Sequence, residues 1–183
     1  MLPAYAGLDL AQVSVVASSA QAAAARAVLE QADALGFDTE SRPTFIRGQL
    51  SSGPHLVQLS TDSHCYLYQV DHLDGLDDLN ALLASPRLIK AGFGLGDDRK
   101  RIAAKLGVEP ADVLELNTVF RERGYRKDMG VKGAVAVLFN RRYIKSKKAS
   151  TSNWANPQLT PAQLIYAAND AWAAIRVYDG LGL

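Results

Sequence analysis

Residues 34–40 form the stretch Ala-Leu-Gly-Phe-Asp-Thr-Glu. It is typical of a central strand that ends before the breaker Arg42-Pro43. Side chains two apart on a strand project from the same face, so Asp38 and Glu40 are expected side by side. Two acids there repel each other unless a cation lies between them, and a divalent ion with oxygen ligands meets that need. The alternative is a strand end where both acids reach water.

The rest of the chain alternates between strand and helix patterns. Strands are expected at 12–17, 55–60, 64–70, 87–93 and 112–116, and helices at 18–35, 75–83, 97–106, 131–139 and 160–178. Residues 42–54 hold two prolines and two glycines and are expected to form a connecting loop. The sequence shows no internal repeat and no second domain. We therefore expect residues 1–183 to form a single domain of the α/β class with a mixed sheet.

Tyr166 and Asp170 are four residues apart inside the last expected helix, so they share one face. A surface hydrogen bond, or a core tyrosine with its hydroxyl satisfied, would explain the pair equally well. Asp97 and Asp98 stand at the start of another expected helix, where the helix dipole favours acids. Taken one at a time, none of these acids identifies a site.

A glycine-rich stretch at 92–96 lies between a strand and a helix, and Glu115 ends the next strand. This arrangement is similar to a dinucleotide-binding loop and allows a nucleotide-dependent oxidoreductase as an alternative. The third glycine arrives one residue early, however. Two aspartates also stand where a pyrophosphate would approach, and their charge would repel it.

The acidic segments form an ordered series: Gly-Phe-Asp-Thr-Glu at 36–40, Lys-Ala-Gly-Phe-Gly-Leu-Gly-Asp-Asp at 90–98, and Tyr-Ala-Ala-Asn-Asp at 166–170. With these motifs the chain resembles the 3′–5′ exonucleases of the DEDD superfamily, in the branch with a tyrosine in the last motif (DEDDy). The likeness is strongest to the exonuclease domain of the Werner syndrome helicase and weaker to ribonuclease D. It covers about residues 12–180, including the approach to the final helix at 151–154 and 159–164.

The resemblance implies a ribonuclease H-like fold, with a mixed five-stranded sheet whose first three strands are antiparallel and which helices flank. It implies two divalent ions, Mg²⁺ or Mn²⁺, and the release of nucleoside 5′-monophosphates from a nucleic acid 3′ end, DNA or RNA. The catalytic residues it implies are Asp38, Glu40, Asp98, Tyr166 and Asp170, of which the four acids would bind metal. Asp98 is preferred to Asp97 because of its distance from Lys90-Ala91-Gly92. A nucleic-acid-binding or partner-binding module of the same fold with a degenerate active site is the alternative, although no motif residue is missing.

Positive charge is concentrated between residues 121 and 148, which hold ten basic residues and only two acidic ones. Such an excess can bind a polyanion by releasing counterions from its phosphates. The nucleic-acid-binding residues expected here are Arg141, Arg142, Lys145, Lys147 and Lys148. Tyr125, Phe139 and Tyr143 lie among them and suit base stacking on a single-stranded 3′ end. The alternatives are a solvated face or a flexible loop, with Phe139 in the core.

The overall composition indicates a globular protein and argues against a secreted or membrane-spanning one. Apolar residues make up 48% and charged residues 21% of the 183, as in a soluble globular protein. The single cysteine, Cys65, excludes a disulfide framework within one chain. No basic residue precedes Arg26, which argues against a signal peptide, and no apolar run reaches the length of a spanning helix. A cytoplasmic, intracellular protein is expected.

Overall fold

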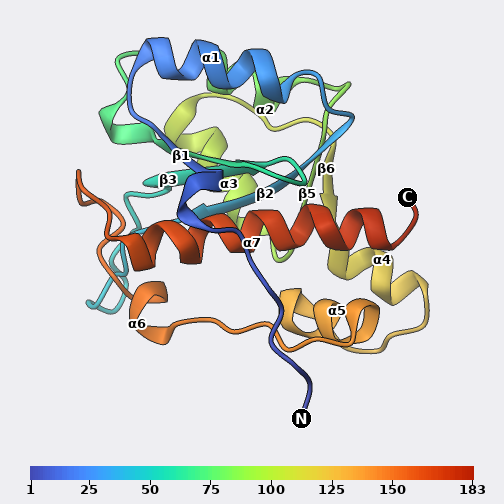
Figure 1. The fold of residues 1–183 in the computed structure, drawn as a ribbon. Coiled ribbons are helices and arrows are strands. Elements are labelled where there is room, and N and C mark those ends of the chain that lie inside the picture. Colours follow the sequence, from blue (N-terminus) through green and yellow to red (C-terminus); the bar gives the residue numbers. More distant parts are fainter.

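A six-stranded mixed sheet forms the centre of the computed structural model, which describes residues 1–183 (Figure 1). The strands run in the order β1-β4-β3-β2-β5-β6. Their bounds are β1 Val13–Val16, β2 Ala34–Glu40, β3 Leu56–Ser60, β4 Cys65–Gln69, β5 Ile89–Gly92 and β6 Val113–Glu115. β3 pairs antiparallel with β2 and β4, and the other pairs are parallel. The expected α/β class with a mixed sheet is confirmed.

The strand count differs from the five that the resemblance implied. The extra strand is β1, which pairs in parallel with β4 at one edge of the sheet. The three antiparallel strands are therefore β2, β3 and β4 rather than the first three of the chain.

Helices cover both faces of the sheet (Figure 1). Their bounds are α1 Ser19–Leu29, α2 Asp77–Ala84, α3 Gly96–Leu106, α4 Leu116–Glu122, α5 Gly130–Phe139, α6 Lys147–Ser150 and α7 Pro161–Gly180. Leu29, Leu79 and Ile102 bring α1, α2 and α3 into one core cluster, whereas α4, α5 and α7 share another. No helix combines the length and the apolarity that crossing a bilayer requires.

Three helical segments differ from the expectation. α1 ends at Leu29 instead of continuing to residue 35, because Ala34 already pairs with Ile89 of β5 and the chain needs a turn before that strand. The short helices α4 and α6 were not expected. Tertiary packing supports α4 through Leu116 and Phe120, and the Ser146 side chain caps α6.

The last helix lies very close to the central strand. A Cβ atom built on Gly36 of β2 would be 1.8 Å from the carbonyl oxygen of Ala171 in α7. Small side chains on the buried face of α7, including Ala167, Ala168 and Ala174, permit this approach. The contact at Gly36 therefore fixes where the residues around Ala171 stand relative to β2.

Candidate active site

Three of the predicted acids meet where α7 crosses β2. One carboxylate oxygen each of Asp38, Glu40 and Asp170 lies within 4.8 Å of the others. Asp38 and Glu40 are partly buried on β2, and Asp170 is buried with 6% of its surface exposed. The alternation along β2 and the contact at Gly36 thus bring together acids that are far apart in the chain.

The charge of this group is not fully compensated. Burial raises the pKa of Asp38 well above its ordinary value, and the charges of Asp170 and Asp98 raise it further. Burial likewise raises the pKa of Glu40, followed by the charges of Asp38 and Asp170. Carboxylate oxygens are hard ligands, so the donor set fits a hard divalent cation.

Neighbouring groups orient the two acids of β2. The backbone N–H of Thr39 donates to Oδ1 of Asp38 at 2.8 Å. Nε2 of Gln58 donates to Oε1 of Glu40 and to the carbonyl oxygen of Ala167, both at 3.3 Å. Gln58 is fully buried on β3 and stands opposite Asp38 in the sheet. Gln58 was not predicted from the sequence, because its role depends on the pairing register of β2 and β3.

Asp98 approaches the group from α3. The Thr39 hydroxyl donates a hydrogen bond to its carboxylate. Burial raises the pKa of Asp98, and the nearby Asp97 and Glu115 add to the effect. Asp98 does not belong to the tight group of three acids. Asp97 is exposed, so of the two adjacent aspartates it is Asp98 that faces β2.

Two side chains from the segment between α5 and α6 engage both oxygens of Asp170. The Tyr143 hydroxyl donates to Oδ1 at 2.8 Å, and Nζ of Lys145 lies 2.9 Å from Oδ2. Burial raises the pKa of Asp170, while Lys145 and Tyr143 act in the opposite direction. Burial lowers the pKa of Lys145, but the charge of Asp170 outweighs it and the net shift is upward. Both contacts were missed, because nothing in the local pattern pairs this segment with α7.

Tyr166 stands one turn before Asp170 on α7. It is partly buried, and its ring centre lies 5.8 Å from that of Trp154. Nζ of Lys145 lies 5.3 Å from the centre of the Tyr166 ring. Burial raises the pKa of Tyr166, and the charge of Asp170 adds to this. The predicted tyrosine therefore lies beside the acids, as its spacing from Asp170 requires.

The glycine-rich stretch has a structural explanation. The Glu115 carboxylate accepts hydrogen bonds from the backbone N–H groups of Leu95 at 2.8 Å and Asn117 at 3.2 Å. A Cβ atom on Gly92 would be 2.3 Å from the carbonyl oxygen of Phe37. The glycine permits close packing and Glu115 anchors the loop, so neither residue points to a dinucleotide site.

The predicted basic residues differ in exposure and in ion pairing. Arg141, Arg142, Lys147 and Lys148 are exposed and form no ion pair. Lys145 does not share that surface, because its ammonium group pairs with Asp170.

The aromatic residues of the basic stretch also differ from one another. Tyr143 is buried, so its ring is not free to stack on a base. Phe139 is partly buried and stacks on Tyr5 at a ring distance of 5.4 Å. Tyr125 retains 38% exposure.

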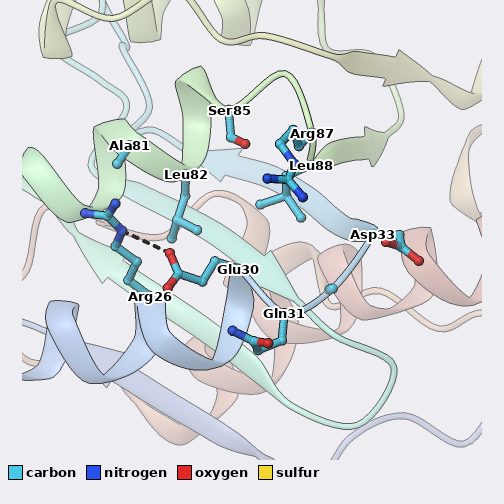
Figure 2. Close-up of a pocket in the computed structure, with 10 residues that line it drawn as sticks. Arg26, Glu30, Gln31, Asp33, Ala81, Leu82, Ser85, Arg87 and Leu88 are labelled. Atoms are coloured by element: carbon cyan, nitrogen blue, oxygen red, sulfur yellow. Dashed lines mark hydrogen bonds and ion pairs between the residues drawn. The ribbon is translucent and has the colours of Figure 1, made fainter.

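A hollow of about 280 Å³ opens at the acids and is lined by Asp38, Asp170, Lys145 and Phe93, among others. A larger hollow of about 520 Å³ lies between α1 and α2, with none of the predicted site residues in its lining (Figure 2). There Arg26 pairs with Glu30 at 3.3 Å and with Asp78 at 3.1 Å. The charged residues of its lining are two arginines, Arg26 and Arg87, and two acids, Glu30 and Asp33. Because these charges balance, the smaller hollow at the acids is the better candidate for chemistry.

Comparison with known proteins agrees with this geometry. A family model described as 3′–5′ exonuclease matches residues 13–183. The bifunctional 3′–5′ exonuclease/ATP-dependent helicase WRN of Mus musculus is 30% identical over 156 residues, which cover 84% of this chain and 11% of that protein. A 3′–5′ exonuclease of Arabidopsis thaliana is 30% identical over 149 residues, covering 80% of this chain and 52% of that protein. The chain thus spans at most about half the length of these two relatives.

Solved structures show the same fold. The EXO domain of Nibbler from Aedes aegypti superimposes with a TM-score of 0.81 at 24% identity, covering 95% of this chain and 88% of that one. Trypanosoma brucei RNase D gives a TM-score of 0.83 at 21% identity, covering 92% and 64%.

The fold is therefore RNase H-like, as the resemblance implied. The match over residues 13–183 is more specific, and the chain belongs to the 3′–5′ exonuclease family.

Proposed function

We propose that this chain removes nucleoside 5′-monophosphates from nucleic acid 3′ ends with the help of two divalent ions, Mg²⁺ or Mn²⁺. The observation that carries the proposal is the meeting of Asp38, Glu40 and Asp170 within 4.8 Å, at a hollow that Asp38 and Asp170 line. Acids held this close, with pKa values raised by burial and by each other, favour a bound cation.

The four acids would divide the binding of the ions. Asp38 would contribute to both sites, Glu40 and Asp170 would complete one, and Asp98 would help to hold the other. When bound, such ions stabilise charge on the attacking and leaving oxygens and lower the pKa of water. Tyr166, one turn from Asp170, orients the attacking water toward the terminal phosphodiester. The backbone N–H of Thr39 and the side chain of Gln58 hold the carboxylates of Asp38 and Glu40, respectively, by hydrogen bonds.

The substrate class is a single-stranded 3′ end of DNA or RNA. One of the similar structures is Trypanosoma brucei RNase D in complex with RNA U12, which supports a nucleic acid ligand for this fold. The exposed and unpaired Arg141, Arg142, Lys147 and Lys148 supply phosphate contacts. Arg141 and Arg142 belong to the segment that also carries Tyr143 and Lys145 to Asp170, and Lys147 and Lys148 follow that segment at the start of α6.

The test is a time course on 5′-labelled single-stranded DNA and RNA with Mg²⁺, Mn²⁺ or EDTA, run beside Asp38→Ala. We expect a metal-dependent ladder that shortens from the 3′ end, with 5′-monophosphates as products and no ladder in the variant. The preferred sugar is read from the same gel. Wild-type activity in Asp38→Ala would refute the site.

A binding module with a degenerate site is the competing function. It predicts retained oligonucleotide binding without degradation under any metal. The presence of all four acids and Tyr166 argues against it, since such a module is free to lose a ligand.

A further inference from the structure

The segment of residues 3–8, which we name the strap, runs across α7 toward α5 (Figure 1). It joins the segment between α5 and α6 through the backbone. The N–H of Arg142 donates to the carbonyl oxygen of Pro3 at 2.8 Å, and the N–H of Tyr5 donates to that of Arg142 at 2.9 Å. Ala4 and Arg142 form a parallel bridge. These bonds hold the residue that immediately precedes Tyr143.

Tyr5 extends this attachment through its ring. The ring stacks on Phe139 at 5.4 Å with an interplanar angle of 8°, and its centre lies 6.5 Å from the Tyr143 ring and 5.4 Å from the Trp172 ring. Tyr5 therefore packs at once against α5, against α7 and against Tyr143. Aromatic contacts of this kind add to the free energy of burial and fix the orientation of the rings.

The strap is also tied to α7 beside the acid. The backbone N–H of Leu8 donates to Oδ1 of Asn169 at 2.8 Å. A Cβ atom on Gly7 would be 2.4 Å from the same oxygen, so the strap lies tightly on this side chain. Asn169 immediately precedes Asp170 in the helix.

The strap does not belong to the part of the chain that defines the family, because the family match begins at residue 13. The strap nevertheless affects the acids through Tyr143, against which Tyr5 packs. Tyr143 is buried, and its hydroxyl donates a hydrogen bond to Asp170. Carboxylates that bind metals are themselves held by hydrogen bonds, and losing such a partner weakens metal binding.

We propose that Tyr143 is a positioning residue that fixes the Asp170 carboxylate for metal, and that Tyr5 of the strap holds Tyr143 in place. The inference rests on the proposed function, because it assigns to Asp170 a bound cation. The proposed role predicts a change in metal affinity when Tyr5 is replaced. A merely structural role of the strap would stabilise the fold without changing metal affinity.

The test compares Tyr143→Phe, Tyr5→Leu and the double variant with wild type. Tyr143→Phe removes only the hydroxyl and leaves the core filled. Tyr5→Leu keeps an apolar side chain but removes the ring that packs against Tyr143. Mn²⁺ affinity is measured by calorimetry on the free protein, and kcat and KM on a single-stranded oligonucleotide. Tyr66→Phe is the matched control, because Tyr66 is a partly buried tyrosine of β4 that packs in the core cluster on the other face of the sheet.

Tyr143→Phe is expected to weaken Mn²⁺ binding and to lower kcat by about 10-fold or more, with KM nearly unchanged. Tyr5→Leu is expected to have a smaller effect in the same direction. The double variant should match Tyr143→Phe alone, because both changes act through the same hydrogen bond to Asp170, and coupled residues are not additive.

Wild-type Mn²⁺ affinity and kcat in Tyr143→Phe would overturn the inference, and so would additive effects in the double variant. A failure of the proposed function is distinguishable, because the wild-type protein itself would then neither bind Mn²⁺ nor degrade the oligonucleotide.

Discussion

The ammonium group of Lys145 lies 2.9 Å from Oδ2 of Asp170, at the point where carboxylates from β2 and α7 face each other. Lys145 thus supplies positive charge to a site that would otherwise hold only acids. Lys145→Met should therefore destabilise the metal-free protein near neutral pH by about 1–3 kcal/mol, less than for a fully buried pair because the lysine is partly exposed. Urea unfolding in EDTA measures this, and Mn²⁺ should restore most of the stability. Equal unfolding free energies for Lys145→Met and the exposed control Lys100→Met would contradict it.

The raised pKa values of Asp38 and Glu40 predict an unusual dependence of stability on pH. In the metal-free protein these acids bind protons more tightly when folded than when unfolded. The resulting stabilisation is complete below the ordinary carboxylate pKa of about 4 and is lost as pH rises through the raised values. The melting temperature in EDTA should therefore fall as the pH rises above the ordinary carboxylate range. Asp38→Asn should flatten this slope, and a slope unchanged by the substitution would assign it to other groups.

The two adjacent aspartates of α3 form a natural matched pair. Asp98 accepts from Thr39 beside β2, whereas Asp97 is exposed. Asp98→Asn should lower kcat by about 10²-fold or more, because it removes a residue that we propose as a metal ligand. Asp97→Asn removes the same charge and should stay within about twofold of wild type. Single-turnover degradation of a labelled oligonucleotide gives both values, and the reverse ranking would transfer the ligand role to Asp97.

Tyr166 is expected to position rather than to bind metal. Tyr166→Phe keeps the ring against Trp154 and removes only the hydroxyl. We expect kcat to fall by about 10- to 100-fold, with Mn²⁺ affinity close to wild type. Calorimetry and steady-state kinetics on one preparation separate the two effects. An unchanged kcat would remove Tyr166 from the mechanism.

Lys147 and Lys148 are exposed and unpaired, so they are available to phosphate. Replacing both with Gln should raise KM and reduce the slope of log KM against log salt by about 0.7 for each phosphate of the single strand that the protein no longer neutralises. Arg87→Gln with Lys100→Gln removes the same charge from other parts of the surface and should leave the slope unchanged. Equal slopes in the two double variants would show that residues 147–148 do not bind the substrate. Lys145 is left out of this test because of its pairing with Asp170.

The parts of the site that local sequence patterns encode were predictable. Asp38 and Glu40 share a face because strand side chains alternate, and Tyr166 and Asp170 share one because they are a helical turn apart. The start of α7 was also predictable, because Thr160 followed by a proline is a local signal for the beginning of a helix. The membership in the exonuclease family followed from the order of the three motifs.

The parts that depend on distant contacts were not predictable. Gln58 reaches Glu40 through the register of two strands, and Lys145 reaches Asp170 through a loop without a regular pattern. The charge pattern along the sequence grouped Lys145 with its basic neighbours, since local charge does not reveal a buried partner. The end of α1 was missed because strand pairing at Ala34 overrides the helix propensity of the preceding residues. The single-domain and cytoplasmic expectations stay predictions.

Gly36 shows how much of this chemistry depends on a residue that has no functional group. Its missing side chain leaves the space in which the Ala171 carbonyl lies. A methyl group at this position would clash with that carbonyl and displace α7, which would move Asp170 away from Asp38 and Glu40. A substitution at Gly36 would then cause the same loss of activity as removing one of the acids, although every acid was still present. Searches for damaging variants that inspect only charged residues would overlook it.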